Sequence, residues 1–135
     1  MKTKILLLTL FLVCLSTSVT AEHHERKPKP DLLVRVIRIS EEFANINTDV
    51  SDTTLAEYGI THGVTFSARF GERTIEAFLG KNYKDVPKGD WVALIEDDHK
   101  LQIAISYGNA ATELGCAVGD TLYIVPKPHD APDED

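Results

Sequence analysis

The sequence predicts a mainly β domain, either a small antiparallel β-barrel or a barrel-like sandwich, with one or two short helices. Three observations lead to this fold class: about six short runs rich in β-branched or alternating apolar residues, tight turns between them, and only brief helical segments. Short strands joined by tight turns are typical of small closed or two-layered antiparallel sheets. The folded part is expected to span residues 31–125.

The first half of this region begins with Leu32–Ile39, whose β-branched residues predict a strand. Residues 43–50 are richer in polar side chains and predict a turn or a short strand. Residues 52–58 predict one or two helical turns, capped by Asp52 and ended by Gly59.

A hairpin is expected next. Apolar residues alternate with polar ones over residues 64–70, which is the period of a strand with one buried face. Gly71 and Glu72 then form a two-residue loop with glycine first, which suits a type II′ turn. Residues 74–79 alternate again and predict the return strand.

The second half of the region predicts another pair of strands, a short helix and a last strand. Residues 91–95 and 101–105 form an apolar pair of strands around a polar loop at 97–100. Residues 110–114 predict a short helix that begins after Asn109 and ends at a glycine. A last strand is expected over residues 121–125.

Both ends of the chain are expected to lie outside the fold. Residues 1–21 have a basic start, an uncharged apolar run and a Val-Thr-Ala end, which predict a signal peptide, because the run is too short to cross a bilayer. Residues 22–30 then predict a flexible linker, and residues 126–135, with three prolines and four acidic residues, a disordered acidic tail. The protein is therefore expected to be secreted or periplasmic.

The charge of the chain restricts its classes of partner, and its cysteine content restricts the disulfides it can form. Without the two leader lysines the chain has 12 basic and 21 acidic residues, a formal charge of −9. Such a protein repels phosphate backbones and anionic lipid, so we expect neither nucleic-acid partners nor membrane binding after signal cleavage. Cys116, the one cysteine left, cannot form an internal disulfide and is expected to be a small buried hydrophobe.

Metal and catalytic signatures are sparse. If cleavage follows Ala21, the new amino terminus and the histidines at 23 and 24 could wrap a square-planar Cu(II) or Ni(II), although terminal histidines are more often solvated. The candidate metal ligands are thus His23 and His24, and no cofactor is expected. No nucleophile–base pair, phosphate loop or paired-carboxylate motif stands out, so catalytic residues are not assigned.

Three segments together resemble one family. Residues 103–115, IAISYGNAATELG, followed by VGD, resemble the "IA-x(n)-GNAA-x-x-LG…GD" stretch of the S-adenosylmethionine hydroxide adenosyltransferases, fluorinases and chlorinases. Residues 43–50, FANINTDV, are similar to its "FGN-x-x-TNI", and residues 82–89, NYKDVPKG, to its "tY-x-dVP-x-G". The likeness covers residues 33–125 and corresponds to the family's C-terminal β-barrel domain alone.

The resemblance implies a site. In the family this domain holds the adenine end of the ligand, within a trimer, against the larger α/β domain of a neighbouring subunit. It implies that Asn45 pairs with the adenine edge, that backbone groups of Asn109 and Ala110 meet the adenine, and that Phe43 packs beside it. Phe78 would correspond to a stacking aromatic.

Two departures from the family pattern bear on the ligand. Ala44 stands where the motif has glycine, which could crowd a close backbone approach. The acidic loop Asp97-Asp98-His99 stands where the halogenating branch binds the methionine carboxylate. A neutral nucleoside such as adenosine is therefore easier to accept here than intact S-adenosylmethionine.

Three of the candidate site residues also have an ordinary structural interpretation. Phe78 lies on the polar parity of its strand and could be a stacking platform or fill a second small core. Asn109 could simply cap a helix, and Asn45 could simply form a turn.

Three functions stay open. The first is an exported binding module for an adenine nucleoside, alone or as part of a homotrimer or with a partner chain. The second is hydrolysis of S-adenosylmethionine to adenosine by an oligomer or with a separate α/β chain, since nothing ahead of Asp31 corresponds to the catalytic domain. The third is a protein-interaction domain that has lost the pocket.

Overall fold

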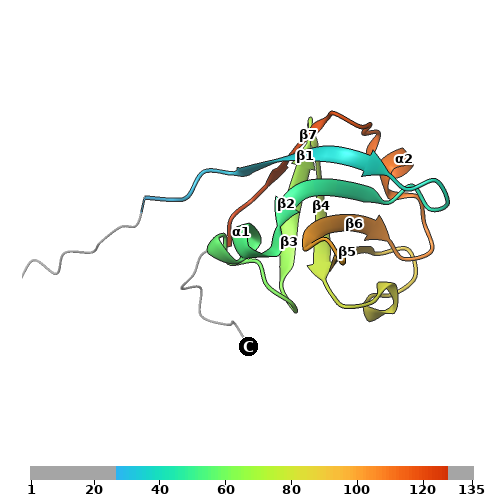
Figure 1. Ribbon diagram of the computed structural model, residues 1–135, viewed down its shortest axis with the longest axis horizontal. Coiled ribbons are helices and arrows are strands. Elements are labelled where there is room, and N and C mark those ends of the chain that lie inside the picture. Colours follow the sequence, from blue (N-terminus) through green and yellow to red (C-terminus); the bar gives the residue numbers. More distant parts are fainter. Residues whose placement is uncertain (1–26, 128–135) are drawn as a thin grey trace, which may run out of the picture.

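The computed structural model describes residues 27–127, which form a closed seven-stranded barrel with strand order β1-β2-β6-β5-β4-β3-β7 (Figure 1). The mainly β barrel with two short helices confirms the predicted fold class. The elements are β1 Leu32–Ile39, β2 Ile46–Ser51, α1 Asp52–Glu57, β3 Thr65–Phe70, β4 Arg73–Leu79, the 3₁₀ turn η1 Tyr83–Asp85, β5 Trp91–Ile95, β6 Lys100–Ile105, α2 Ala110–Leu114 and β7 Thr121–Ile124.

One strand pair departs from the expected antiparallel pattern. β4 and β5 run parallel, with Phe78 opposite Val92 and Leu79 opposite Ala93, whereas the other six pairs are antiparallel. Parallel neighbours cannot be joined by a hairpin, because the chain must return along the sheet before the second strand begins. Residues 80–90 make this return, and they contain η1, which the sequence did not predict.

The barrel interior is filled by the alternating apolar residues of the strands. The largest fully buried side chains among the described residues include Phe66, Leu122 and Ile103, and Leu55 of α1 joins them. Cys116 is free and buried in the same cluster, as predicted, and burial raises the pKa of its thiol. With no disulfide available to this residue, the fold depends on its apolar core.

The short helices and turns follow local rules. α1 is capped by Ser51, whose hydroxyl accepts from the Thr54 amide at 3.2 Å, so the predicted cap at Asp52 was one residue late. Gly71 has φ 60° and Glu72 does not have a positive φ, which fits the predicted type II′ hairpin. α2 occupies the predicted residues and ends at Gly115 in the left-handed region.

Both ends of the described chain meet α1. Lys29 donates from its ammonium to the Glu57 carbonyl at 2.7 Å, and the Lys127 amide donates to the Tyr58 carbonyl at 3.0 Å. The two ends leave the barrel on the same side (Figure 1). The predicted signal peptide, most of the linker with His23 and His24, and most of the acidic tail lie outside the described residues. Within residues 27–127, no helix has the length and apolar character needed to span a bilayer.

Two neighbouring residues of β1 allow a test of which face of this strand is buried inside the barrel. Val34 is 1% exposed inside it, whereas Leu33 is 64% exposed on its outer surface. We expect Val34→Ala to lower the free energy of unfolding by about 2 kcal/mol, because it leaves a cavity. Leu33→Ala should change the free energy of unfolding by less than about 0.5 kcal/mol. Urea denaturation measures both, and equal losses would contradict the assigned faces of β1.

Candidate functional site

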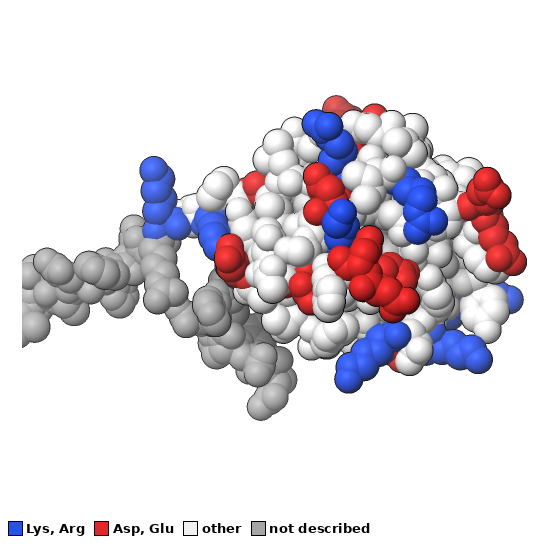
Figure 2. Space-filling model, in the orientation of Figure 1, with Lys and Arg blue, Asp and Glu red and all other residues white. Residues whose placement is uncertain are grey.

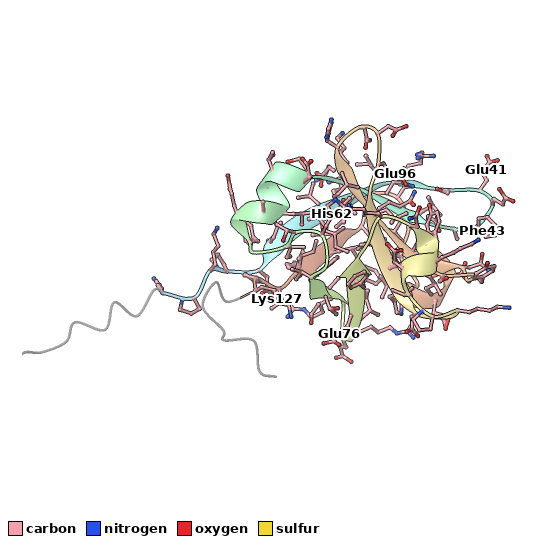
Figure 3. The ribbon with its side chains drawn as sticks, turned by 90° about the horizontal axis from the view of Figure 1, so that it is seen from below. Glu41, Phe43, His62, Glu76, Glu96 and Lys127 are labelled. Atoms are coloured by element: carbon pink, nitrogen blue, oxygen red, sulfur yellow. The ribbon has the colours of Figure 1, made fainter. Side chains whose placement is uncertain are left out.

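A cleft of about 480 Å³ opens at one end of the barrel. Three segments form its walls: the end of the β1–β2 loop, the crossover that contains η1, and the chain that leaves β6. Figure 3 shows Phe43 and Glu41 together on the β1–β2 loop, at the end of the barrel away from the two termini. The lining residues are Phe43, Asn45, Asn82, Tyr83, Lys84, Asp85, Ile105 and Tyr107.

Backbone contacts hold the first and third walls together. The Ala111 amide at the start of α2 donates to the Ala44 carbonyl at 2.9 Å, which ties α2 to the β1–β2 loop. The Gly108 amide donates to the Ile105 carbonyl at 3.0 Å and closes the turn after β6. A Cβ on Gly108 would lie 2.5 Å from Ile105 Cγ2, so only glycine fits beside this lining residue.

A hydrogen-bond network fastens the crossover to the barrel. The Tyr83 hydroxyl of η1 donates to Gln102 Oε1 at 2.6 Å, and Asn45 Nδ2 donates to Tyr83 Oη at 3.2 Å and to Gln102 Oε1 at 3.4 Å. Asn45 and Gln102 are buried, at 7% and 5% exposed. Buried amides of this kind are costly unless paired, so Tyr83 both covers and satisfies them.

The network continues away from the cleft and fixes the orientation of Asn45. Gln102 Nε2 donates to Asn47 Oδ1 at 3.0 Å, and Asn47 Nδ2 donates to the Ser40 hydroxyl at 3.1 Å. Because Gln102 Oε1 is an acceptor, the side of Asn45 that faces it must be the amide nitrogen. Among the hydrogen bonds of residues 27–127, none uses Asn45 Oδ1 as an acceptor, which leaves that oxygen for a ligand.

Aromatic rings surround the buried amide. Phe43, Tyr83 and Tyr107 are 51%, 40% and 67% exposed, and all three line the cleft. Large exposed aromatics gathered at one hollow are unusual on a folded surface, where isolated apolar residues are the norm. Together with Asn45 they offer stacking surfaces near a buried hydrogen-bonding group, which suits a flat, polar-edged ring.

Backbone strain is concentrated beside the cleft. Three non-glycine residues among those described have positive φ, and two of them, Ala44 at 49° and Tyr107 at 59°, lie on the loops that form its walls. The left-handed region costs an ordinary residue about 1–2 kcal/mol. Strain of this sort often marks functional loops, because packing must hold the chain in place.

Charges of both signs reach the same cleft. Lys84 and Asp85 line it, and the Lys88 ammonium lies 5.3 Å from the ring centroid of Tyr107. The Lys81 and Asn82 amides donate to Asp85 Oδ2 at 2.7 and 3.1 Å, and these bonds lower the pKa of Asp85. Gly80 permits this turn, since a Cβ there would lie 2.7 Å from the same oxygen.

The predicted site residues separate into two groups. Phe43 and Asn45 line the cleft, whereas Asn109 and Ala110 lie just beyond Tyr107 at the start of α2. Ala110 is buried, and Asn109 occupies the cap position without a side-chain capping bond. The structure therefore brings the segments at 43–45 and 107–111 together, while the cleft itself uses Phe43 and Asn45 of the predicted set.

Phe78 lies elsewhere. It does not line the cleft but is half-buried on β4 opposite Val92, which belongs to a small outer cluster of apolar residues. Tyr83 and Tyr107 were missed by sequence reasoning, because a tyrosine in a loop carries no periodic signal. The aromatic of the NYKDVPKG segment was the available sign for Tyr83.

The acidic loop at 97–99 does not line the cleft either. It belongs to the β5–β6 turn beside α1, where His99 Nδ1 lies 3.4 Å from Asp52 Oδ2. The acidic residues of this loop are therefore outside the cleft lining. No group of three or more potential metal ligands occurs within the described part of the chain.

The strained alanine gives a stability test. Ala44→Gly should raise the free energy of unfolding by roughly 0.5–1 kcal/mol, because relief of the left-handed strain exceeds the added chain entropy. Ala56→Gly in α1 should have the opposite sign and cost about 1 kcal/mol. Urea midpoints for both variants measure this, and destabilisation by Ala44→Gly would contradict the strain.

The Tyr83 phenol gives a pH test. Burial, and then the charge of Glu96, raise its pKa, and the bond from Asn45 offsets part of this rise. Since the folded pKa exceeds the unfolded value of about 10, its contribution is fully present below pH 10 and is lost as pH rises through the folded pKa. Stability above pH 10 should therefore fall more steeply in the wild type than in Tyr83→Phe. Parallel pH profiles would refute this.

Comparison with known proteins gives a family match and two similar solved structures. A family model for the SAM hydroxide adenosyltransferase C-terminal domain matches residues 34–123. An uncharacterized conserved protein from Thermotoga maritima shares the fold, with 22% identity, TM-score 0.67, and coverage of 74% of this chain but 39% of its own. A conserved hypothetical protein from Thermus thermophilus has 20% identity, TM-score 0.50, and coverage of 69% of this chain and 34% of its own.

The chain thus spans less than half the length of these two solved relatives. No match was found among curated proteins. The family match covers most of the barrel, from β1 to β7, together with all three walls of the cleft. This chain belongs to the family of SAM hydroxide adenosyltransferase C-terminal domains.

Proposed function

We propose that this chain is a small-molecule binding module whose cleft holds an adenine nucleoside. The observation that carries the proposal is the free Oδ1 of Asn45, a buried amide whose nitrogen is already engaged, at the base of a ring of exposed aromatics. An acceptor held in this way selects a ligand with a donor at the edge of a flat ring.

Adenine meets these requirements. Its exocyclic amine can donate to Asn45 Oδ1, while its faces can stack on Phe43 or Tyr107 at the rim. The cleft volume of about 480 Å³ falls within the range of about 300–1,000 Å³ typical of small-molecule pockets. Half of the Phe43 side chain is exposed without a ligand, which leaves apolar area that stacking would bury.

A second candidate is hydrolysis of S-adenosylmethionine by a larger assembly. The family match and the exposed aromatic rim favour it, because a partner α/β chain or further copies in a homotrimer could close the open side of the cleft. Adenosine formation by the purified protein, followed by chromatography, tests catalysis by this chain alone. A protein-interaction role without a ligand would leave the same aromatic rim as its contact surface.

The proposal also includes export. The charge and apolar pattern of residues 1–21 is that of a signal peptide, so the binding module would act outside the cytoplasm, in the periplasm or medium. Sequencing the amino terminus of the mature protein tests this part separately, since cleavage after Ala21 makes Glu22 the first residue.

Two phenylalanines distinguish the proposed site from other surfaces. Phe43→Ala should weaken adenosine binding roughly tenfold, because stacking is worth about 1–3 kcal/mol and the side chain is half exposed in the free protein. Phe78→Ala, which changes an aromatic outside the cleft, should leave the affinity within about twofold.

Isothermal titration of adenosine and S-adenosylmethionine into both variants and the wild type measures this effect. Circular dichroism confirms that each variant is folded. The absence of binding heat with either ligand at high concentration would remove the nucleoside proposal. A loss caused by Phe78→Ala but not by Phe43→Ala would move the site away from this cleft.

A further inference from the structure

We infer that the cleft accepts an adenine nucleotide with a phosphate group in preference to the bare nucleoside. This inference rests on the proposed function and adds a second recognition element to it. It starts from the local balance of charge: the sequence carries a formal charge of −7, yet residues 80–90, which form one wall of the cleft, carry three lysines and two aspartates.

Three lysines lie on the crossover between β4 and β5. Lys84 lines the cleft, Lys88 places its ammonium 5.3 Å from the ring centroid of Tyr107, and Lys81 lies on the same turn. Lys81, Lys84 and Lys88 are all exposed. In Figure 2, basic side chains lie along the lower edge of the face shown, which is the side where Figure 1 places this crossover.

The nearby acidic groups oppose these lysines only in part. Asp85 is the one carboxylate that lines the cleft among the described residues, and two backbone amides already bind its Oδ2. Glu96 acts on Tyr83 through its charge but does not line the cleft. Glu41 and Glu42 make the β1–β2 loop acidic, although neither lines the cleft, whereas on the crossover three lysines outnumber Asp85 and Asp90 (Figure 3).

This division of charge orients a ligand that carries an anion. With the base between the aromatic rings and the amide of Asn45, an anionic tail is attracted to the crossover wall and repelled from the β1–β2 loop. Lys88 rests over the Tyr107 ring, so a phosphate beside that ring would be within reach of its flexible side chain. A phosphate fits better than a neutral ribose edge, because exposed lysines gain little from uncharged acceptors.

The test compares ligands that differ only in the phosphate. Isothermal titration at low ionic strength should show that adenosine 5′-monophosphate binds roughly tenfold more tightly than adenosine, as expected for two partly exposed charge pairs. In the double variant Lys84→Ala with Lys88→Ala, the ratio of the two affinities should fall to about one. Added salt should reduce the ratio in the wild type.

A matched control removes the same charge elsewhere. The double variant Lys29→Ala with Lys100→Ala also loses two positive charges, but neither residue lies on the crossover or contacts a lining residue, so the ratio should stay within about twofold of the wild-type value. Inorganic phosphate alone serves as a further probe. If inorganic phosphate binds as tightly as adenosine 5′-monophosphate and displaces it, the lysines form only a general anion site and the inference fails.

The outcomes separate the two proposals. If adenosine binds and the monophosphate binds no more tightly, or if its advantage survives the replacement of Lys84 and Lys88, the nucleotide inference is overturned while the nucleoside-binding proposal stands. If neither ligand binds, both fall together. A monophosphate advantage that disappears only in the cleft variant supports the inference.

Discussion

The parallel pairing of β4 and β5 is the constraint on which the candidate site depends. Because two parallel neighbours cannot be joined by a tight turn, residues 80–90 must return along the barrel before β5 begins. That return carries η1 over the outer face of the sheet, where it becomes one wall of the cleft. An antiparallel meander of the same strands would have no such wall. The pocket is thus a consequence of strand topology.

The polar network makes this return a fixed wall. Gln102 is buried on the face of β6 opposite to the core residues Leu101 and Ile103, and its amide is satisfied by Asn47 and Tyr83. If Tyr83 moved away, the buried Gln102 oxygen would lose its shortest hydrogen bond, which carries a desolvation cost. Tyr83 also accepts from the nitrogen of Asn45, so one tyrosine both anchors the crossover and engages the amide nitrogen of Asn45.

Sequence reasoning succeeded where a local pattern determines the structure. Alternating apolar residues placed β3 and β4, and the Asn-Ala-Ala-Thr-Glu-Leu-Gly run placed α2 between its N-terminal asparagine and the glycine that ends it. The direction of β5 relative to β4 could not be read in this way, because apolar alternation is the same in either direction. The roles of Tyr83 and Tyr107 depend on that topology, so they too became apparent only in three dimensions.

The cleft and the core are held by different forces, and this separation bears on function. Apolar burial inside the barrel determines whether the chain folds, while the cleft is built mostly from loop residues, including Tyr107 in left-handed backbone, and from amides on the outer face. Substitutions at the rim can therefore change the surface of the cleft with little loss of stability, as at other surfaces presented by loops on a rigid scaffold. A binding module and an interaction domain can therefore share this barrel. The side chains at 43, 45, 83 and 107 are where those two functions would differ.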